Sequence, residues 1–126
     1  MPCATHEVLD LEPSGFAPAR ARRLVRDVVS PLVPADVAHT AELLVSELVT
    51  NAITHGTGVV RLSIDCADHA LSVTVGDEEP AGPEIQPERL MSMGGRGLRM
   101  MESLASAWGV TARPDGHGKD VWFRLP

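Results

Sequence analysis

The sequence predicts an α+β fold, a two-layer α/β sandwich in which helices cover one face of a mostly antiparallel sheet. Two long segments with apolar residues three and four positions apart come first, and two runs of alternating apolar and polar residues follow them. One more helical segment then precedes a last pair of strands. Helices and strand pairs in this order are typical of a sheet that is covered on one side.

The composition places the chain among ordinary single-domain globular proteins. Its 126 residues favour one domain, and 44% hydrophobic with 22% charged residues is a usual balance. Aromatic residues make up only 3% of the chain, so we expect an aliphatic core. The net charge of −6 argues against direct binding to nucleic acid, because phosphate contacts need clustered Lys and Arg.

The cysteines and the apolar runs indicate a cytoplasmic protein. Cys3 and Cys66 lie far apart in the sequence, which predicts neither a disulfide framework nor a zinc site and is typical of a reducing compartment. No basic segment is followed by an apolar stretch, and no apolar run reaches about 18 residues. We therefore expect no signal peptide and no membrane contact.

Residues 1–15 are predicted to form an N-terminal segment, and residues 16–126 the single domain. Val8, Leu9 and Leu11 favour a short edge strand within the first segment, ended by the Pro-Ser-Gly sequence that follows.

Two helices are predicted from the apolar spacing that comes next. The first starts near Pro18 and ends at Pro31 and Pro34, because proline lacks the N–H that a continuing helix needs. The second opens near Asp36 as its N-cap and closes at the Gly-Thr-Gly turn of residues 56–58. Four arginines lie broadly on the polar side of the first helix: Arg20, Arg22, Arg23 and Arg26. They form either a solvated face or a docking patch for an acidic partner.

The second half of the chain carries the strands and a long loop. Residues 59–66 and 71–75 alternate apolar with polar side chains and read as an antiparallel hairpin. Residues 76–95 contain four glycines and three prolines, and a segment of this length predicts a lid, at about 78–95. A helix over 96–107 and a final hairpin, turned around residues 114–118, complete the fold.

Glu47 and Asn51 are the first candidate site residues. They are four positions apart on the second helix and so point the same way. A carboxylate and a carboxamide on one face can hold a hydrated cation and orient a hydroxyl nucleophile. The plainer interpretation is a polar edge of an amphipathic helix. His55, one turn further on, favours a partner of the helix dipole rather than a catalytic base.

Two further segments bear on a nucleotide site. Asp77 follows an apolar strand, where its carboxylate could accept a hydrogen bond from the amino group of a planar ligand such as adenine, or could simply be a turn acid. A glycine cluster leads into the last helix, where unpaired amides and the dipole favour phosphate, although a flexible hinge is the alternative. The cluster consists of Gly94, Gly95, Arg96, Gly97 and Leu98.

Together and in this order, the three segments resemble the ATP-binding domain shared by histidine kinases, gyrase-type ATPases and chaperone ATPases, the Bergerat fold. More narrowly, residues 47–56, 95–98 and 120–125 look like those of the anti-sigma-factor serine/threonine kinases, small single-domain regulators that are abundant in actinobacteria. The resemblance runs from about Phe16 to Leu125.

The resemblance implies a role for each candidate residue. Glu47 would be the general base toward a serine or threonine hydroxyl, and Asn51 would be a ligand of the Mg²⁺ that bridges the ATP phosphates. Asp77 would accept the adenine amino group. Amides of the glycine cluster would bind the phosphates: those of Gly95, Gly97 and Leu98, with Gly94 and Arg96 nearby.

The chain departs from the family pattern on the adenine side. Asp77 is followed by Glu78 and Glu79 where the broader fold has Gly-x-Gly, and Asp120 stands where relatives often carry a threonine. We expect the two extra carboxylates, Glu78 and Glu79, to make that wall more negative, and Asp120 is an acid that does not replace the threonine as a donor.

The leading hypothesis is therefore a cytoplasmic ATP- and Mg²⁺-dependent regulator that binds a sigma factor or its antagonist and phosphorylates the antagonist. The alternative is a protein-binding switch of the same fold with weak or no catalysis, which Glu79 and Asp120 favour. A fragment of an ATP-hydrolysing machine is disfavoured because the chain lacks the further domains. A homodimer is compatible with the sequence, which does not decide it.

Overall fold

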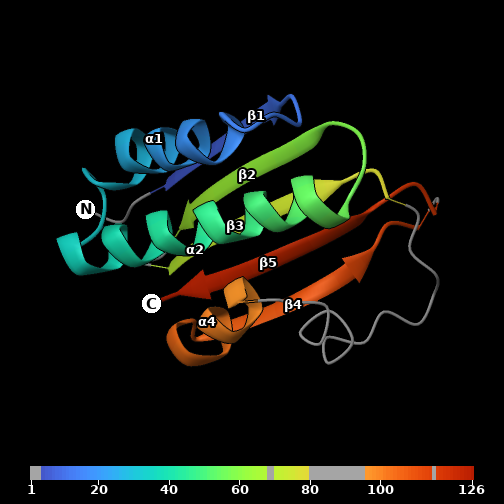
Figure 1. Ribbon diagram of the computed structural model, residues 1–126. Coiled ribbons are helices and arrows are strands. Elements are labelled where there is room, and N and C mark those ends of the chain that lie inside the picture. Colours follow the sequence, from blue (N-terminus) through green and yellow to red (C-terminus); the bar gives the residue numbers. More distant parts are fainter. Residues whose placement is uncertain (1–3, 68–69, 80–95, 115) are drawn as a thin grey trace.

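The computed structural model describes residues 4–67, 70–79, 96–114 and 116–126 (Figure 1). In chain order its elements are β1 (Ala4–Leu11), α1 (Ala17–Val29), α2 (Ala35–His55), β2 (Val60–Ala67), β3 (Ala70–Asp77), α4 (Arg96–Leu104), β4 (Ala107–Ala112) and β5 (Lys119–Leu125). Most of the predicted lid falls outside the described residues.

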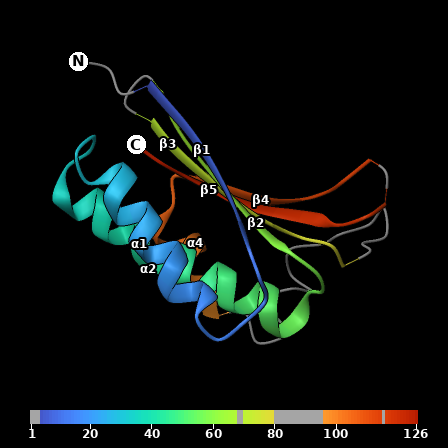
Figure 2. The same cartoon turned by 90° about the horizontal axis from the view of Figure 1, so that it is seen from above.

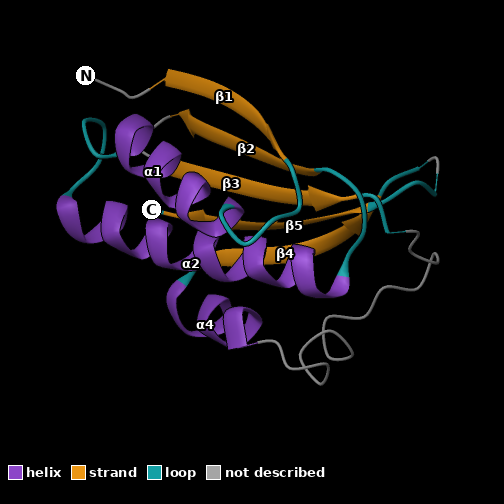
Figure 3. Cartoon of the chain, turned by 45° about the horizontal axis from the view of Figure 1, so that its top comes forward, coloured by secondary structure: helices purple, strands orange, loops and turns teal. Residues whose placement is uncertain are grey.

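The strands form one antiparallel sheet in the order β1-β2-β3-β5-β4. All the described helices lie on one face of this sheet, as Figure 2 shows from above and Figure 3 from an intermediate angle. The predicted α+β fold class, a two-layer sandwich with a sheet covered on one side, is confirmed. The opposite face of the sheet carries no helix in the part of the chain that the structure describes.

Alternation along the strands separates the two faces of the sheet. In β2 the side chains of Leu62, Ile64 and Cys66 are buried, while Arg61 and Asp65 between them are exposed. Successive residues of a strand point to opposite faces, so the apolar set meets the helices. The same alternation places three fully buried side chains of the neighbouring strands in the core: Leu71, Val73 and Phe123.

Helix α2 is the central helix of the covering layer. Its buried stripe includes Leu44, Leu48 and Val49, each side chain of which contributes about 1.5–3 kcal/mol when fully removed from water. It packs against α1 on one side and α4 on the other (Figure 3). On the α1 side, Arg26 donates to Glu42 across the helix pair, with an Nη2–Oε1 distance of 2.9 Å.

Several element ends differ from the prediction, and those of α2 and α4 have a visible cause. The N-cap of α2 is Pro34 rather than Asp36, and Asp36 lies in the first turn, where its charge favours the positive end of the helix dipole. Helix α4 ends at Leu104, three residues early, because the chain already joins the sheet there. The backbone N–H of Ser106 donates to Arg124 of β5, and Ala107 pairs with Arg124 as the first residue of β4.

The edge strand β1 is tied to β2 by charged cross-strand pairs. Arg61 Nε donates to Asp10 Oδ1 at 2.9 Å, and His6 contacts Asp65. The hydrogen bond from Arg61 lowers the pKa of Asp10 below its ordinary value. The stabilisation from this pair is therefore present above the ordinary pKa of Asp10 and is lost as the pH falls through the lowered one.

The same strand pairing corrects the expectation about the cysteines. Cys66 is buried and disulfide-bonded. Distance along the sequence was a poor guide to cysteine pairing because β2 runs antiparallel beside β1, which sets Thr5 opposite Cys66. Cys3, the other cysteine of the sequence, lies outside the described residues. The cysteines therefore give no support to a reducing compartment.

Among the described residues, no helix has both the length and the apolar character needed to cross a membrane.

Replacing Leu44 with alanine is expected to lower the free energy of unfolding by about 2–5 kcal/mol, because the side chain is fully buried under α2. Leu43, the preceding residue of the same helix, is 40% exposed, so Leu43→Ala is a matched control that should cost less than about 1 kcal/mol. Urea unfolding followed by circular dichroism measures both. Equal losses would contradict this helix orientation.

Candidate functional site

Glu47 and Asn51 lie at the boundary between the buried and exposed sides of α2. Both are half-buried. Their spacing puts them on one side of the helix, away from Glu42, which faces α1. That side is the one along which α4 lies. The structure thus brings the acid and the amide to the same edge of α2, opposite the side that faces α1.

Asp77 ends β3 and is the one buried charged residue in the described part of the chain. Its carboxylate lies against the C-terminal end of α2: a Cβ added at Gly56 would be 2.6 Å from Asp77 Cγ. The last turn of α2 and the end of β3 therefore meet at the same place. Glu47, Asn51 and Asp77 are thereby placed along one helix and at its tip.

Gly56 is the predicted end of α2, but for a different reason from the one expected. A glycine C-cap commonly adopts a left-handed conformation, whereas Gly56 has φ −102° and is extended. Any residue could adopt that backbone. What excludes a side chain here is the neighbouring Asp77 carboxylate, together with the backbone oxygen of Ala52.

Lys119 is the partner of the buried Asp77 carboxylate. Its Nζ donates to both carboxylate oxygens, at 3.1 Å from Oδ1 and 2.9 Å from Oδ2. The two residues are directly opposite each other in the β3–β5 pairing, so their side chains share one face of the sheet. Both side chains are largely shielded from water: that of Asp77 is 4% exposed and that of Lys119 is 14% exposed. The backbone N–H of Glu79 adds a third donor to Oδ1 at 2.8 Å.

The electrostatic reason for this pair lies in the surroundings of the carboxylate. A buried charge is costly unless it is paired and hydrogen-bonded. The C-terminal end of a helix is moreover the negative end of its dipole, so it disfavours a neighbouring carboxylate. The ammonium of Lys119 offsets both effects. Sequence reasoning did not single out Lys119, although an antiparallel register that ends β3 at Asp77 and starts β5 at Lys119 would have found it.

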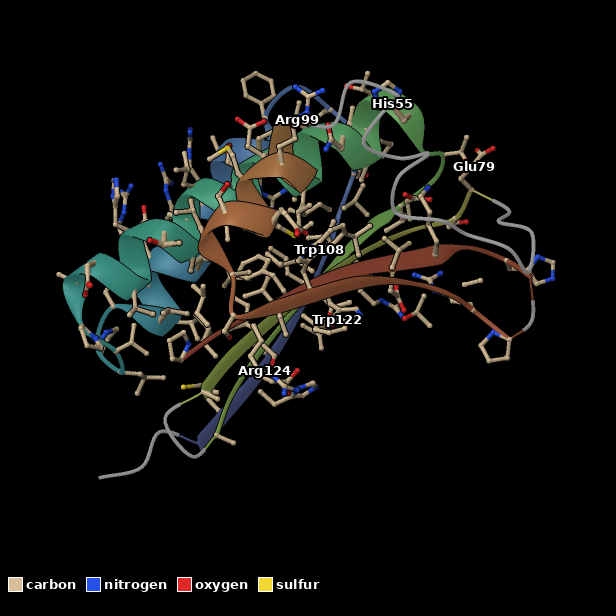
Figure 4. All side chains as sticks on the ribbon, turned by 90° about the horizontal axis from the view of Figure 1, so that it is seen from below. His55, Glu79, Arg99, Trp108, Trp122 and Arg124 are labelled. Atoms are coloured by element: carbon tan, nitrogen blue, oxygen red, sulfur yellow. The ribbon has the colours of Figure 1, made fainter. Side chains whose placement is uncertain are left out.

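Asp120 does not belong to the adenine side, contrary to the expectation. It pairs with Gly76, one position away from the Asp77–Lys119 pair, so it points to the uncovered face of the sheet. There it accepts a hydrogen bond from Arg113 Nη2 at 3.2 Å. Figure 4 shows Trp122 and Arg124, which share its face by alternation, on the side away from the helices.

Glu78 is also occupied elsewhere. Its Oε1 accepts a hydrogen bond from the backbone N–H of Val59 at 2.7 Å, and its own N–H donates to the carbonyl of Thr57 at 2.8 Å. These bonds join the turn after α2 to the end of β3. Gly58 allows the close approach with φ +74°, a conformation that side chains rarely adopt. Glu78 and Asp120 thus have hydrogen-bond partners other than the Asp77 carboxylate, and the more negative adenine wall stays a prediction.

The glycine cluster is described only from the start of α4. Arg96, Gly97 and Leu98 are the first residues of this helix, whereas Gly94 and Gly95 lie outside the described residues. Helix α4 packs against α2. A helix N-terminus near this segment is thus present in the structure, and the phosphate cradle stays a prediction.

His55 and the arginines of α1 take the plainer interpretations that the sequence allowed. His55 is exposed in the last turn of α2, where it can partner the negative end of the helix dipole (Figure 4). Arg26 pairs with Glu42. Arg20, Arg22 and Arg23 are exposed on α1.

A comparison with known families finds one matching model. The histidine kinase-like ATPase domain matches residues 16–125, which run from the residue before α1 to the end of β5 and include every candidate site residue. Among curated proteins, no relative matches the chain.

Gly56→Ala is expected to lower the free energy of unfolding by about 1–3 kcal/mol, because the new methyl group would collide with the Asp77 carboxylate and the α2 backbone. Gly15 has open space around it, so Gly15→Ala is the matched control and should be neutral or stabilising by up to about 1 kcal/mol. Thermal and urea unfolding compare the two variants. A neutral Gly56→Ala would contradict the close approach described.

Proposed function

The chain belongs to the histidine kinase-like ATPase domain family, and we propose that it is a regulatory protein that binds ATP with Mg²⁺ and phosphorylates a partner protein on serine or threonine. The observation that carries this proposal is the placement of Glu47 and Asn51 on one edge of α2, whose end meets Asp77. The resemblance to anti-sigma-factor kinases supplies the finer proposal of a sigma factor or its antagonist as partner.

The residues of α2 fit the metal that this proposal needs. Mg²⁺ prefers oxygen ligands, keeps several waters and is commonly held by one or two side chains together with substrate phosphates. The half-buried Asn51 carboxamide and the Glu47 carboxylate offer oxygens of this kind on one edge of a rigid helix. We propose Asn51 as the metal ligand and Glu47 as the general base toward the partner's hydroxyl.

A second candidate function is a protein-binding switch of the same fold without catalysis. The specific observation that favours it is the Asp77–Lys119 ion pair, because the carboxylate that would recognise adenine already has an internal partner. Exposed arginines on α1, Arg20, Arg22 and Arg23, would then serve as the contact surface for an acidic partner. In this case partner regulation would not depend on ATP.

Asn51→Ala is expected to weaken binding of Mg-ATP at least about 10-fold, because a metal ligand is lost. Thr50, the preceding residue, is exposed on a different side of α2, so Thr50→Ala should leave the affinity unchanged. Isothermal titration calorimetry with Mg-ATP and Mg-ADP measures both, after circular dichroism has verified folding. If the wild type does not bind nucleotide at millimolar concentration, the enzymatic proposal is wrong.

Glu47→Gln tests the proposed base separately from binding. We expect the variant to retain nucleotide affinity but to lose phosphate transfer by about 10²–10⁴-fold, the usual contribution of a general base. The partner is first isolated by pull-down from the native cell, and transfer from ATP labelled in the γ-phosphate is then measured. Transfer at the wild-type rate would exclude Glu47 as the base. A wild type that regulates the partner without any transfer would favour the switch.

A further inference from the structure

We propose that Lys119 determines the nucleotide-base selectivity of this site, because its ammonium holds the position on Asp77 that an amino group of the base would take. The inference rests on the proposed nucleotide binding. It concerns a residue that the chain itself places across the sheet from Asp77.

The first argument is the occupancy of the Asp77 carboxylate. Lys119 donates to both oxygens, and the N–H of Glu79 donates to Oδ1. The backbone of Gly56 also lies close to Oδ2, since an added Cβ would be 2.6 Å from that oxygen. A carboxylate has about four acceptor positions, so three hydrogen bonds from two donor groups and a close backbone leave little room for a further group.

The second argument is that this pairing is built into the sheet. Asp77 and Lys119 are cross-strand neighbours in β3 and β5, not residues of two independent loops. Lys119 is also the only lysine of the sequence, and the other ten of its eleven basic residues are arginines. A lysine is rarely shielded from water unless it is paired.

The consequence is a change in what the base end of the site can recognise. A carboxylate alone accepts a hydrogen bond from an amino group and rejects a carbonyl. A carboxylate whose acceptor positions are taken by an ammonium no longer favours an amino group, and the ammonium can itself donate to a carbonyl, so the preference for the amino group is lost. Adenine and hypoxanthine differ by the amino group or carbonyl at C6, with the matching change at N1. We therefore expect the chain to bind Mg-ATP and Mg-ITP with similar affinity.

The test compares the ratio of the two dissociation constants in the wild type and in Lys119→Thr, by calorimetry. In the wild type the ratio is expected to stay within about threefold, and in Lys119→Thr we expect ATP to be preferred at least about 10-fold, the value of one well-placed hydrogen bond. Arg113→Thr is the matched control. It removes a nearby cation, in the turn after β4, that pairs with Asp120 on the uncovered face, and should leave the ratio unchanged.

The outcomes separate the inference from the function on which it rests. A wild type that already prefers ATP at least 10-fold, or a Lys119→Thr variant with an unchanged ratio, overturns the role of Lys119 and leaves nucleotide binding intact. If neither protein binds either nucleotide, the result counts against the proposed function itself.

A measurement on the wild type keeps the proposal testable if Lys119→Thr fails to fold. Because Lys119 is the only lysine, lysine labelled with an isotope at Cε gives the signal of a single residue in a heteronuclear NMR spectrum. We expect Mg-ATP and Mg-ITP to shift the signal of its Cε group, and Mg-tripolyphosphate, which has no base, to leave it in place. A signal that does not move while calorimetry records nucleotide binding overturns the proposal.

Discussion

The ion pair between Asp77 and Lys119 is the interaction on which the arrangement of this end of the molecule depends. It joins β3 to β5 at the point where α2 ends, and it allows a carboxylate to be buried beside the negative end of a helix dipole. Because the carboxylate occupies the space next to Gly56, that position accepts no side chain. The helix, the two strands and the glycine are thus constrained by a single buried charge and its partner.

The remaining charges near this end are held in separate places. Glu78 closes the turn after α2 through Val59, and Asp120 binds Arg113 on the other face of the sheet. Glu78 directly follows Asp77 and Asp120 directly follows Lys119, yet the carboxylates of both bind other groups. The buried pair itself contains one carboxylate and one ammonium, so its own two charges balance. A ligand at this pair would meet the ammonium beside a carboxylate that already accepts hydrogen bonds.

Much of the fold could be predicted from the sequence because its signals are local. Apolar spacing located α1 and α2, alternation located β2, β3, β4 and β5, and prolines and glycines marked the turns between them. The same rules ended α4 too late, because Ser106 leaves the helix for a hydrogen bond with a strand distant in the sequence. The same rules predicted no disulfide for Cys66, because the residues beside it are set by the pairing of β2 with β1.

The candidate site divides in the same way. The sequence by itself determined that Glu47 and Asn51 share a helical edge and that Asp77 follows an apolar strand, because these relations follow from the periods of a helix and a strand. Only the tertiary structure decided which residue faces Asp77. Side chains in a strand alternate, so a shift of one position exchanges the two faces of the sheet. The β3–β5 register therefore puts Lys119 beside Asp77 and turns Asp120 away, and no local pattern contains that register.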